Sequence, residues 1–292
     1  MKLSFLIVTK NRPDDLVFTL NKLKNFIDSS IHEVLVFIDG CSKTEAIIDE
    51  FNWVNWTISK ESISASPARH ILYKKAKGTI FIGLDDDAHP ISTDFITTIV
   101  SEFDENQNLG IIAFQEIRGL FKSDVEALKR AKPSQSFFTN DFVGCGFAIK
   151  KDVYNLTNGF PVWMDIYGEE SALAIEVLDL GFDIKYNSNI MVNHRVDVEK
   201  RKLQKRNYFR FERQLINSIK YYLIYYKYPS VKILKLLLHN FKKYALSDIR
   251  YFKLFFKALL IVFFQFFSIL KFRKPVKKST ITKKVSLQLL SY

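Results

Sequence analysis

Three consecutive carboxylates, Asp85, Asp86 and Asp87, directly follow the apolar run 79–84, which we interpret as a buried strand. Like charges at contact distance raise one another's pKa unless a cation neutralises them. Carboxylate oxygens suit Mg²⁺ or Mn²⁺, which commonly bridge to substrate phosphates. The triplet therefore predicts a divalent-cation site at a strand end, and an acidic surface loop is the alternative without function.

Two other groups of polar residues lie at the ends of apolar runs. Glu169 and Glu170 begin a stretch of helical periodicity, and His194 ends the apolar run 190–193. Acidic residues are favoured in the first turn of any helix, so an ordinary solvated helix start is the alternative for the glutamates. A lone histidine at a strand end is also commonly structural.

The elements that must position these residues alternate between short apolar runs and amphipathic stretches. This pattern is typical of βα units around a mostly parallel sheet, whose ligands bind at the carboxyl ends of the strands. Ser66 and Pro67 predict a helix start, with Ser66 as the N-cap. We expect strands at 3–9, 34–38, 56–59, 79–84, 110–115, 144–149, 182–186 and 190–193, with helices at 13–27, 44–51, 67–76, 92–103 and 169–180. A loop or broken helix is expected within 118–142.

Five segments occur in the order and at the strand ends typical of family 2 glycosyltransferases, which the chain resembles over residues 3–194. The resemblance implies an α/β fold of the nucleotide-sugar-binding GT-A type, with a mostly parallel sheet flanked by helices. The segments are Val8-Thr9-Lys10-Asn11-Arg12-Pro13, Asp39-Gly40-Cys41-Ser42, Pro67-Ala68-Arg69-His70, Asp85-Asp86-Asp87-Ala88-His89-Pro90 and Gly168-Glu169-Glu170.

The resemblance implies that the first three segments bind a nucleotide-sugar donor. Thr9 and Asp39 would contact the nucleobase. Arg69 would lie near the diphosphate or nucleoside, since a guanidinium group suits phosphate oxygens. Asn11 and Arg12 would belong to the same donor site, with a solvated role as the alternative for Arg12.

The resemblance also implies a metal-dependent reaction. Asp87 would be the direct metal ligand, Asp85 or Asp86 would face the nucleoside, and His194 would lie beside the metal or diphosphate as a second ligand. Mn²⁺ or Mg²⁺ is the expected cofactor, and a UDP-sugar is the favoured donor.

The catalytic base is expected in the last segment. Relatives usually carry Glu-Asp there, whereas this chain carries Glu169-Glu170, and the extra methylene moves the carboxylate by roughly 1.5 Å, enough to matter in catalysis. We assign the base to Glu170, with Glu169 as the alternative. The implied reaction is a single displacement that inverts the anomeric carbon.

The charge of the chain is strongly divided. The formal net charge is +12, but residues 195–292 carry 24 Lys and Arg against four Asp and Glu. Because these basic residues are interleaved with long aromatic and aliphatic runs, we expect a membrane surface as the partner, and not nucleic acid. A glycan or polyprenyl-linked acceptor at the cytoplasmic face of a membrane, in bacterial surface polysaccharide synthesis, would suit this composition.

The division also predicts two domains, a catalytic domain at 1–196 and a helical, basic extension at 197–292. The segment 231–243 has the composition of an interfacial helix. The apolar stretch 258–270 is shorter than the roughly 20 residues needed to span a bilayer, so we expect it to lie in the interface. A membrane span is one alternative, and a bundle packed on the catalytic domain or on a second subunit of a homo-oligomer is another.

Other features narrow the function classes. Cys41 and Cys145 lie in apolar surroundings, so no disulfide framework is expected, and a reducing cytosol fits. The N-terminal apolar run is too short for a signal peptide and is expected to be a strand. Two alternatives to an enzyme stay open: an inactive relative that binds nucleotide or partner proteins, and a basic nucleic-acid-binding protein.

Overall fold

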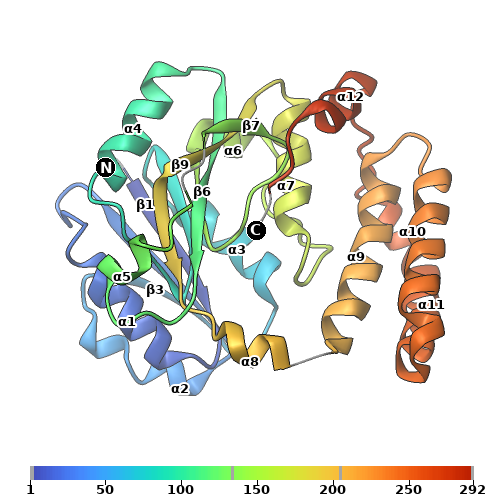
Figure 1. Ribbon diagram of the computed structural model, residues 1–292, viewed down its shortest axis with the longest axis horizontal. Helices are drawn as coiled ribbons and strands as arrows, with labels where there is room; N and C mark the ends of the chain where they lie inside the picture. The colour runs from blue at the N-terminus through green and yellow to red at the C-terminus, as the bar shows by residue number, and fades with distance from the viewer. Residues whose placement is uncertain (1–2, 133–134, 204–205, 291–292) are drawn as a thin grey trace.

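A single mixed sheet organises the first two thirds of the chain (Figure 1). The computed structural model describes residues 3–132, 135–203 and 206–290. The strands follow the order β3-β2-β1-β4-β8-β6-β9-β5, and β7 pairs with β9. Their bounds are β1 Leu3–Thr9, β2 Glu33–Asp39, β3 Val54–Ser59, β4 Ile80–Asp85, β5 Ala88–Pro90, β6 Leu109–Arg118, β7 Phe137–Thr139, β8 Gly146–Lys150 and β9 Asp183–His194.

The strand directions bring the carboxyl ends of six strands to one edge of the sheet. β1 to β4 pair in parallel, and β8 lies antiparallel between β4 and β6, so that β6 and its parallel neighbour β9 run in the same direction as β4. The expected fold, a mostly parallel sheet flanked by helices, is confirmed. The two strands expected at 182–186 and 190–193 form one long strand, β9, with a register shift opposite its middle.

Helices cover both faces of this sheet. On one face α1 (Pro13–Leu23) and α4 (Phe95–Glu105) pack on the strands, and on the other face lie α3 (Ala65–Lys75), α6 (Lys151–Leu156) and α7 (Glu169–Asp179). In α1 the fully buried Leu16, Leu20 and Leu23 recur at helical spacing, so one stripe of the helix packs on the sheet. The buried strands are rich in Ile, Val, Leu and Phe, as strands covered on both faces require.

Several local predictions need correction. α3 begins at Ala65, so Ser66 lies in its first turn and donates a hydrogen bond to the carbonyl of Pro161 at 2.7 Å, where capping had been expected. The helix expected at 44–51 is divided into α2 (Ser42–Glu45) and a 3-10 turn, η1 (Ile48–Glu50). The region 118–142 contains the short helix α5 (Asp124–Leu128) and strand β7.

The C-terminal part forms a helical bundle beside α7 (Figure 1). Ala172 and Ile175 on the outer face of α7 share one apolar cluster with residues of α9, η2 and α11, such as Leu215 and Phe255. A bundle packed on the catalytic domain was one of the alternatives that the sequence allowed, and the structure has this arrangement. The elements are α8 (Val198–Leu203), α9 (Tyr208–Tyr225), α10 (Ser230–Lys243), η2 (Ala245–Ser247), α11 (Ile249–Leu270) and α12 (Lys278–Ser286).

Candidate active site

A cavity of about 840 Å³ lies at the carboxyl edge of the sheet. Its position follows from the strand directions, because polar residues at the ends of β1, β2, β4, β6 and β9 all reach this edge. Two of the residues predicted from the sequence, Asn11 and Asp86, do not line it. The predicted residues that do line it are Thr9, Arg12, Asp39, Arg69, Asp85, Asp87, Glu169, Glu170 and His194.

The carboxylates of the triplet have different partners, and Asp86 is fully buried behind the cavity. Its carboxylate accepts a 2.7 Å hydrogen bond from Thr9 Oγ1 and forms an ion pair with Arg12. Burial raises the pKa of Asp86 to about 7, although Arg12 opposes this shift. Asp86 therefore holds the end of β1 and the side chain of Arg12 in place, and it does not face the cavity as had been expected for a nucleoside contact.

Asp85, Asp87 and His194 form the best candidate metal site. One potential ligand atom from each lies within 4.8 Å of the others, and His194 Nε2 is 3.3 Å from Asp87 Oδ1. That Oδ1 is buried and has no hydrogen-bond partner, whereas Oδ2 accepts a 2.6 Å hydrogen bond from Arg12. Two carboxylates and an imidazole around an unsatisfied buried oxygen are a donor set that fits a divalent cation such as Mn²⁺.

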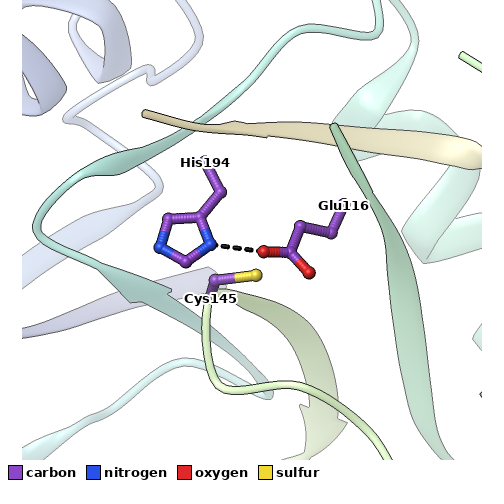
Figure 2. Close-up of side chains that lie close together, drawn as sticks. All are labelled: Glu116, Cys145 and His194. Atoms are coloured by element: carbon purple, nitrogen blue, oxygen red, sulfur yellow. Dashed lines mark hydrogen bonds and ion pairs between the residues drawn. The ribbon is translucent and has the colours of Figure 1, made fainter. Parts of the chain in front are cut away.

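Glu116, near the end of β6, lies beside His194 and is hydrogen-bonded to it (Figure 2). Its carboxylate accepts a hydrogen bond from His194 Nδ1 and is paired with Arg118 at 2.8 Å, and Cys145 Sγ lies beside both side chains. Burial alone would raise the pKa of Glu116, but these two partners lower it. A carboxylate on Nδ1 fixes the orientation of the imidazole and leaves Nε2 for a metal. Glu116 was not predicted from the sequence, because nothing in an ordinary strand sequence distinguishes it.

Arg69 lies between the acidic triplet and the glutamate pair. Its Nη2 donates to Asp85 Oδ1 at 2.8 Å, and its Nη1 donates to Glu170 Oε1 at 2.9 Å and lies 3.4 Å from Glu169 Oε1. Burial would lower the pKa of this guanidinium, but the surrounding carboxylates keep it above its ordinary value. Arg69 is therefore a permanent cation that joins the two acidic parts of the site.

Glu169 and Glu170 begin α7, as the sequence predicts. Burial raises the pKa of both carboxyl groups above the ordinary glutamate value, while the charge of Arg69 opposes the shift. Gly168, at φ 111°, sets the direction in which the helix starts, in a region that favours glycine. A Cβ at Gly144 would lie 2.3 Å from Glu170 Oε1, so a glycine there leaves room for the Arg69–Glu170 pair.

Asp39 organises a loop that lines the cavity next to the end of β2. Its carboxylate accepts hydrogen bonds from Ser62 Oγ and from the backbone amides of Ile63 and Ser64 at 2.6 to 3.1 Å. Ser64 has a positive φ of 76° and leads into α3, which carries Arg69. The β2 carboxylate thus fixes the loop that positions Arg69, in addition to lining the cavity.

The C-terminal bundle contacts the loop that leads to the glutamates. Asn217 of α9 is buried, and its amide nitrogen lies 3.1 Å from Asp165 Oδ1 and 2.7 and 3.3 Å from the carbonyl oxygens of Ile166 and Tyr167. Tyr167 has a φ of 72°, an unfavourable conformation for a tyrosine that needs support from its surroundings. This contact was not predicted, since no sequence pattern links positions 217 and 167.

A protein-family model described as glycosyl transferase family 2 matches residues 4–154. No curated protein sequence matches the chain.

Solved structures share the fold at low sequence identity. GalNAc-T7 with UDP, GalNAc and Mn²⁺ has a TM-score of 0.62 at 15% identity; the match covers 80% of this chain but only 49% of GalNAc-T7, so the chain spans about half of that protein's length. The mannosyltransferase PcManGT of Pyrobaculum calidifontis, with GDP-Man and Mn²⁺, has a TM-score of 0.58 at 14% identity, covering 97% of this chain and 83% of its own. S. aureus TarS 1–349 with UDP-GlcNAc has 0.58 at 15%, covering 89% and 80%.

Proposed function

Because this chain belongs to glycosyl transferase family 2, whose model matches just over half of it, we propose that it is a metal-dependent, inverting glycosyltransferase with a nucleotide diphosphate sugar as donor. One observation carries the proposal. A single cavity joins a candidate cation site, Asp85, Asp87 and His194, to the Glu169–Glu170 pair through the guanidinium of Arg69.

The acceptor hydroxyl loses its proton to Glu170. The side chain of Glu170 is partly exposed to the cavity, whereas that of Glu169 is almost fully buried, so an acceptor reaches Glu170 more easily. The raised pKa of Glu170 makes it a stronger base than an ordinary glutamate. The deprotonated oxygen attacks the anomeric carbon opposite the leaving diphosphate, and one displacement inverts that carbon.

Asp85, Asp87 and His194 would hold the cation, which when bound supplies positive charge to the leaving diphosphate. Glu116 keeps the imidazole of His194 oriented for this task. Arg12, which is paired with Asp87 and partly exposed, contributes a further positive charge on the same side of the cavity. Thr9 and Asp39 are the proposed nucleoside contacts.

We favour a UDP-sugar as the donor. Two of the three structures compared above contain UDP or a UDP-sugar, and the third contains GDP-Man, so the shared property is a nucleoside diphosphate leaving group. The acceptor is proposed to be a glycan or a polyprenyl-linked glycan in bacterial surface polysaccharide synthesis.

We place the acceptor at the cytoplasmic face of a membrane, to which the C-terminal bundle attaches. Among the described helices, α11 alone is long and apolar enough to cross a membrane. One face of α11 packs in the bundle through Tyr251, Phe255 and Ala258, so we propose that it lies in the interface with its opposite face in lipid. That face is an apolar stripe at helical spacing, formed by Phe252, Phe256, Leu260, Phe263 and Phe267.

The test is turnover of a panel of UDP- and GDP-sugars with Mn²⁺, detected as release of nucleoside diphosphate. We expect one donor to be hydrolysed slowly by the wild-type chain, and Asp87→Ala to abolish this reaction. EDTA should stop it and added Mn²⁺ should restore it. Metal-independent release, or nucleotide binding without any turnover across the panel, would contradict the proposal and favour an inactive nucleotide-binding relative.

A further inference from the structure

One end of the cavity is lined by the C-terminal part of the chain. Phe209, Arg210 and Gln214 come from α9, and Leu289 and Leu290 come from the segment after α12. These residues lie far along the sequence from the donor motifs, all of which fall within residues 8–90. The cavity therefore has a donor end formed by the sheet and a second end formed by the extension.

The segment after α12 is tied to the catalytic part by several contacts. Gln288 forms a β-bridge with Thr139, whose Oγ1 also donates to the Gln288 carbonyl at 2.8 Å. The amide of Asn140 donates to the carbonyl of Lys284 at 2.7 Å, and Lys284 Nζ donates back to the Asn140 carbonyl at 3.2 Å. These bonds place Leu289 and Leu290 at the cavity.

Arg210 differs from the other arginines at the cavity. Arg12, Arg69 and Arg118 are each paired with carboxylates. Within the part of the chain that the structure describes, Arg210 has no carboxylate partner, and its guanidinium stacks over the Tyr167 ring at 5.0 Å. Its charge and hydrogen-bond donors are therefore available to an anion that enters this end of the cavity.

Exposed apolar side chains line the cavity together with Arg210. Phe209 is 54% exposed and Leu289 is 71% exposed, although both side chains are large and hydrophobic. A free glycan would leave these side chains in water, whereas an acceptor with a hydrocarbon chain would cover them. A cavity lined by a stacked cation and by exposed apolar side chains is complementary to an amphiphile that carries a phosphate next to an apolar chain.

We propose that this end of the cavity is the acceptor subsite, in which Arg210 binds the phosphate of a prenyl-phosphate-linked acceptor and Phe209, Leu289 and Leu290 contact its first hydrocarbon units. This assignment rests on the proposed glycosyltransferase function. A phosphate bound at Arg210 would bring the acceptor sugar toward Glu170, because Tyr167, which stacks with Arg210, lies three residues before Glu170 in the chain.

The experiment measures binding of farnesyl diphosphate to the full chain by isothermal titration calorimetry, with inorganic pyrophosphate as the second probe. We expect Arg210→Gln to weaken farnesyl diphosphate binding about 10-fold or more, since a charged hydrogen bond is lost. Leu289→Asn should weaken binding of farnesyl diphosphate and leave pyrophosphate unchanged. Asp87→Asn, at the donor end, should leave farnesyl diphosphate binding unchanged.

Arg250→Gln and Leu246→Asn are the matched controls. Arg250 also stacks on a tyrosine, Tyr208, at 4.4 Å, and Leu246 is 66% exposed, but neither lines the cavity. Equal affinity of the wild type and Arg210→Gln, or a loss in Asp87→Asn alone, would overturn the inference. If both controls weaken binding as much as the cavity variants, the ligand sits on the bundle surface and the subsite is wrong.

The outcomes for the two proposals are separable. Donor turnover by the wild type without Arg210-dependent binding of farnesyl diphosphate would reject the subsite and keep the glycosyltransferase. Arg210-dependent binding of farnesyl diphosphate in a chain that turns over no donor would keep the binding site and reject the glycosyltransferase. Anionic phospholipid also carries a phosphate next to hydrocarbon chains. If phosphatidylglycerol vesicles displace farnesyl diphosphate from the wild type, and bind less well to Arg210→Gln, the site binds bulk lipid. That result would reject the acceptor subsite.

Discussion

Arg69 is shared between two carboxylates that have different tasks in the proposed reaction. Asp85 belongs to the candidate cation site and Glu170 is the proposed base, and one buried guanidinium is hydrogen-bonded to both. This arrangement reduces the repulsion between Asp85 and Glu170, because the positive charge of Arg69 lies between them. It also means that the position of the base depends on the acidic triplet. A change on either side of Arg69 is therefore expected to affect both.

The identity of the base is tested by replacing each glutamate with glutamine. We expect Glu170→Gln to lower the rate of transfer by 10²- to 10⁴-fold, the usual contribution of a general base, and Glu169→Gln to keep a rate within about 10-fold of wild type. Donor affinity, measured by titration with UDP and Mn²⁺, should change little in either variant. The opposite order of the two effects would move the assignment to Glu169.

The pH dependence of the wild type follows from the raised pKa of Glu170. The base works only when ionised, so the rate is lost as the pH falls through its pKa. Because burial raises that pKa above 4.5, the fall should occur at a higher pH than for an ordinary glutamate. The acid limb of kcat/KM against pH measures it, and an acid limb at or below pH 4.5 would rule Glu170 out as the titrating group.

Glu116 provides a test of the metal site away from the direct ligands. Since its carboxylate orients His194, Glu116→Gln should weaken Mn²⁺ binding by about 10- to 100-fold, measured as the Mn²⁺ concentration for half-maximal turnover. Glu102→Gln is the control, because Glu102 pairs with Lys185 outside the cavity. An unchanged Mn²⁺ requirement in Glu116→Gln would show that the metal does not use His194.

At the scale of elements, the sequence predicts which residues lie at the carboxyl ends of the strands. It does not predict the residues that hold those side chains and loops in place. Thr9, Asp39 and Asp85 end strands whose apolar runs are visible in the sequence, and parallel pairing brings such ends together. Glu116 and Asn217 act through contacts between residues distant in sequence, and no local pattern marks them. The return of residues 287–290 to the cavity could not be predicted from the sequence either, because it depends on the β-bridge between Thr139 and Gln288.

The contact between α9 and the loop 165–167 ties the extension to the proposed catalytic glutamates. Asn217→Ala should lower kcat by about 10- to 100-fold while the KM for the donor changes little, because the loop sets the position of the glutamates and misplacements near 1 Å are costly. Asn240→Ala is the control, since Asn240 bonds only within α10. If kcat in Asn217→Ala equals that of the control, the contact only stabilises the bundle.

For the whole molecule, the strongly basic part of the chain coincides with the C-terminal helical bundle. The bundle carries most of the positive charge, and two of its acidic residues are paired internally, Glu212 with Lys257 and Asp248 with Arg206. The sequence could not decide between an apolar helix in a bundle and one in a membrane, because both need the same residues. In the structure, one apolar face of α11 packs in the bundle and the other is exposed.

Attachment of that exposed face to lipid is the prediction that concerns the whole molecule. Phe263 and Phe267 are 73% and 81% exposed, and burying each in lipid would contribute roughly 1.5 to 3 kcal/mol, so Phe263→Glu with Phe267→Glu should reduce co-flotation with vesicles at least 10-fold. Phe138→Glu, exposed on β7 of the catalytic part, should leave flotation unchanged. Vesicles with phosphatidylglycerol should bind more strongly than neutral ones, and 0.5 M salt should remove the difference. Equal flotation of all variants would contradict attachment through the apolar face of α11, because the basic residues would then bind the vesicles alone. A preference for DNA at matched salt would contradict membrane attachment itself.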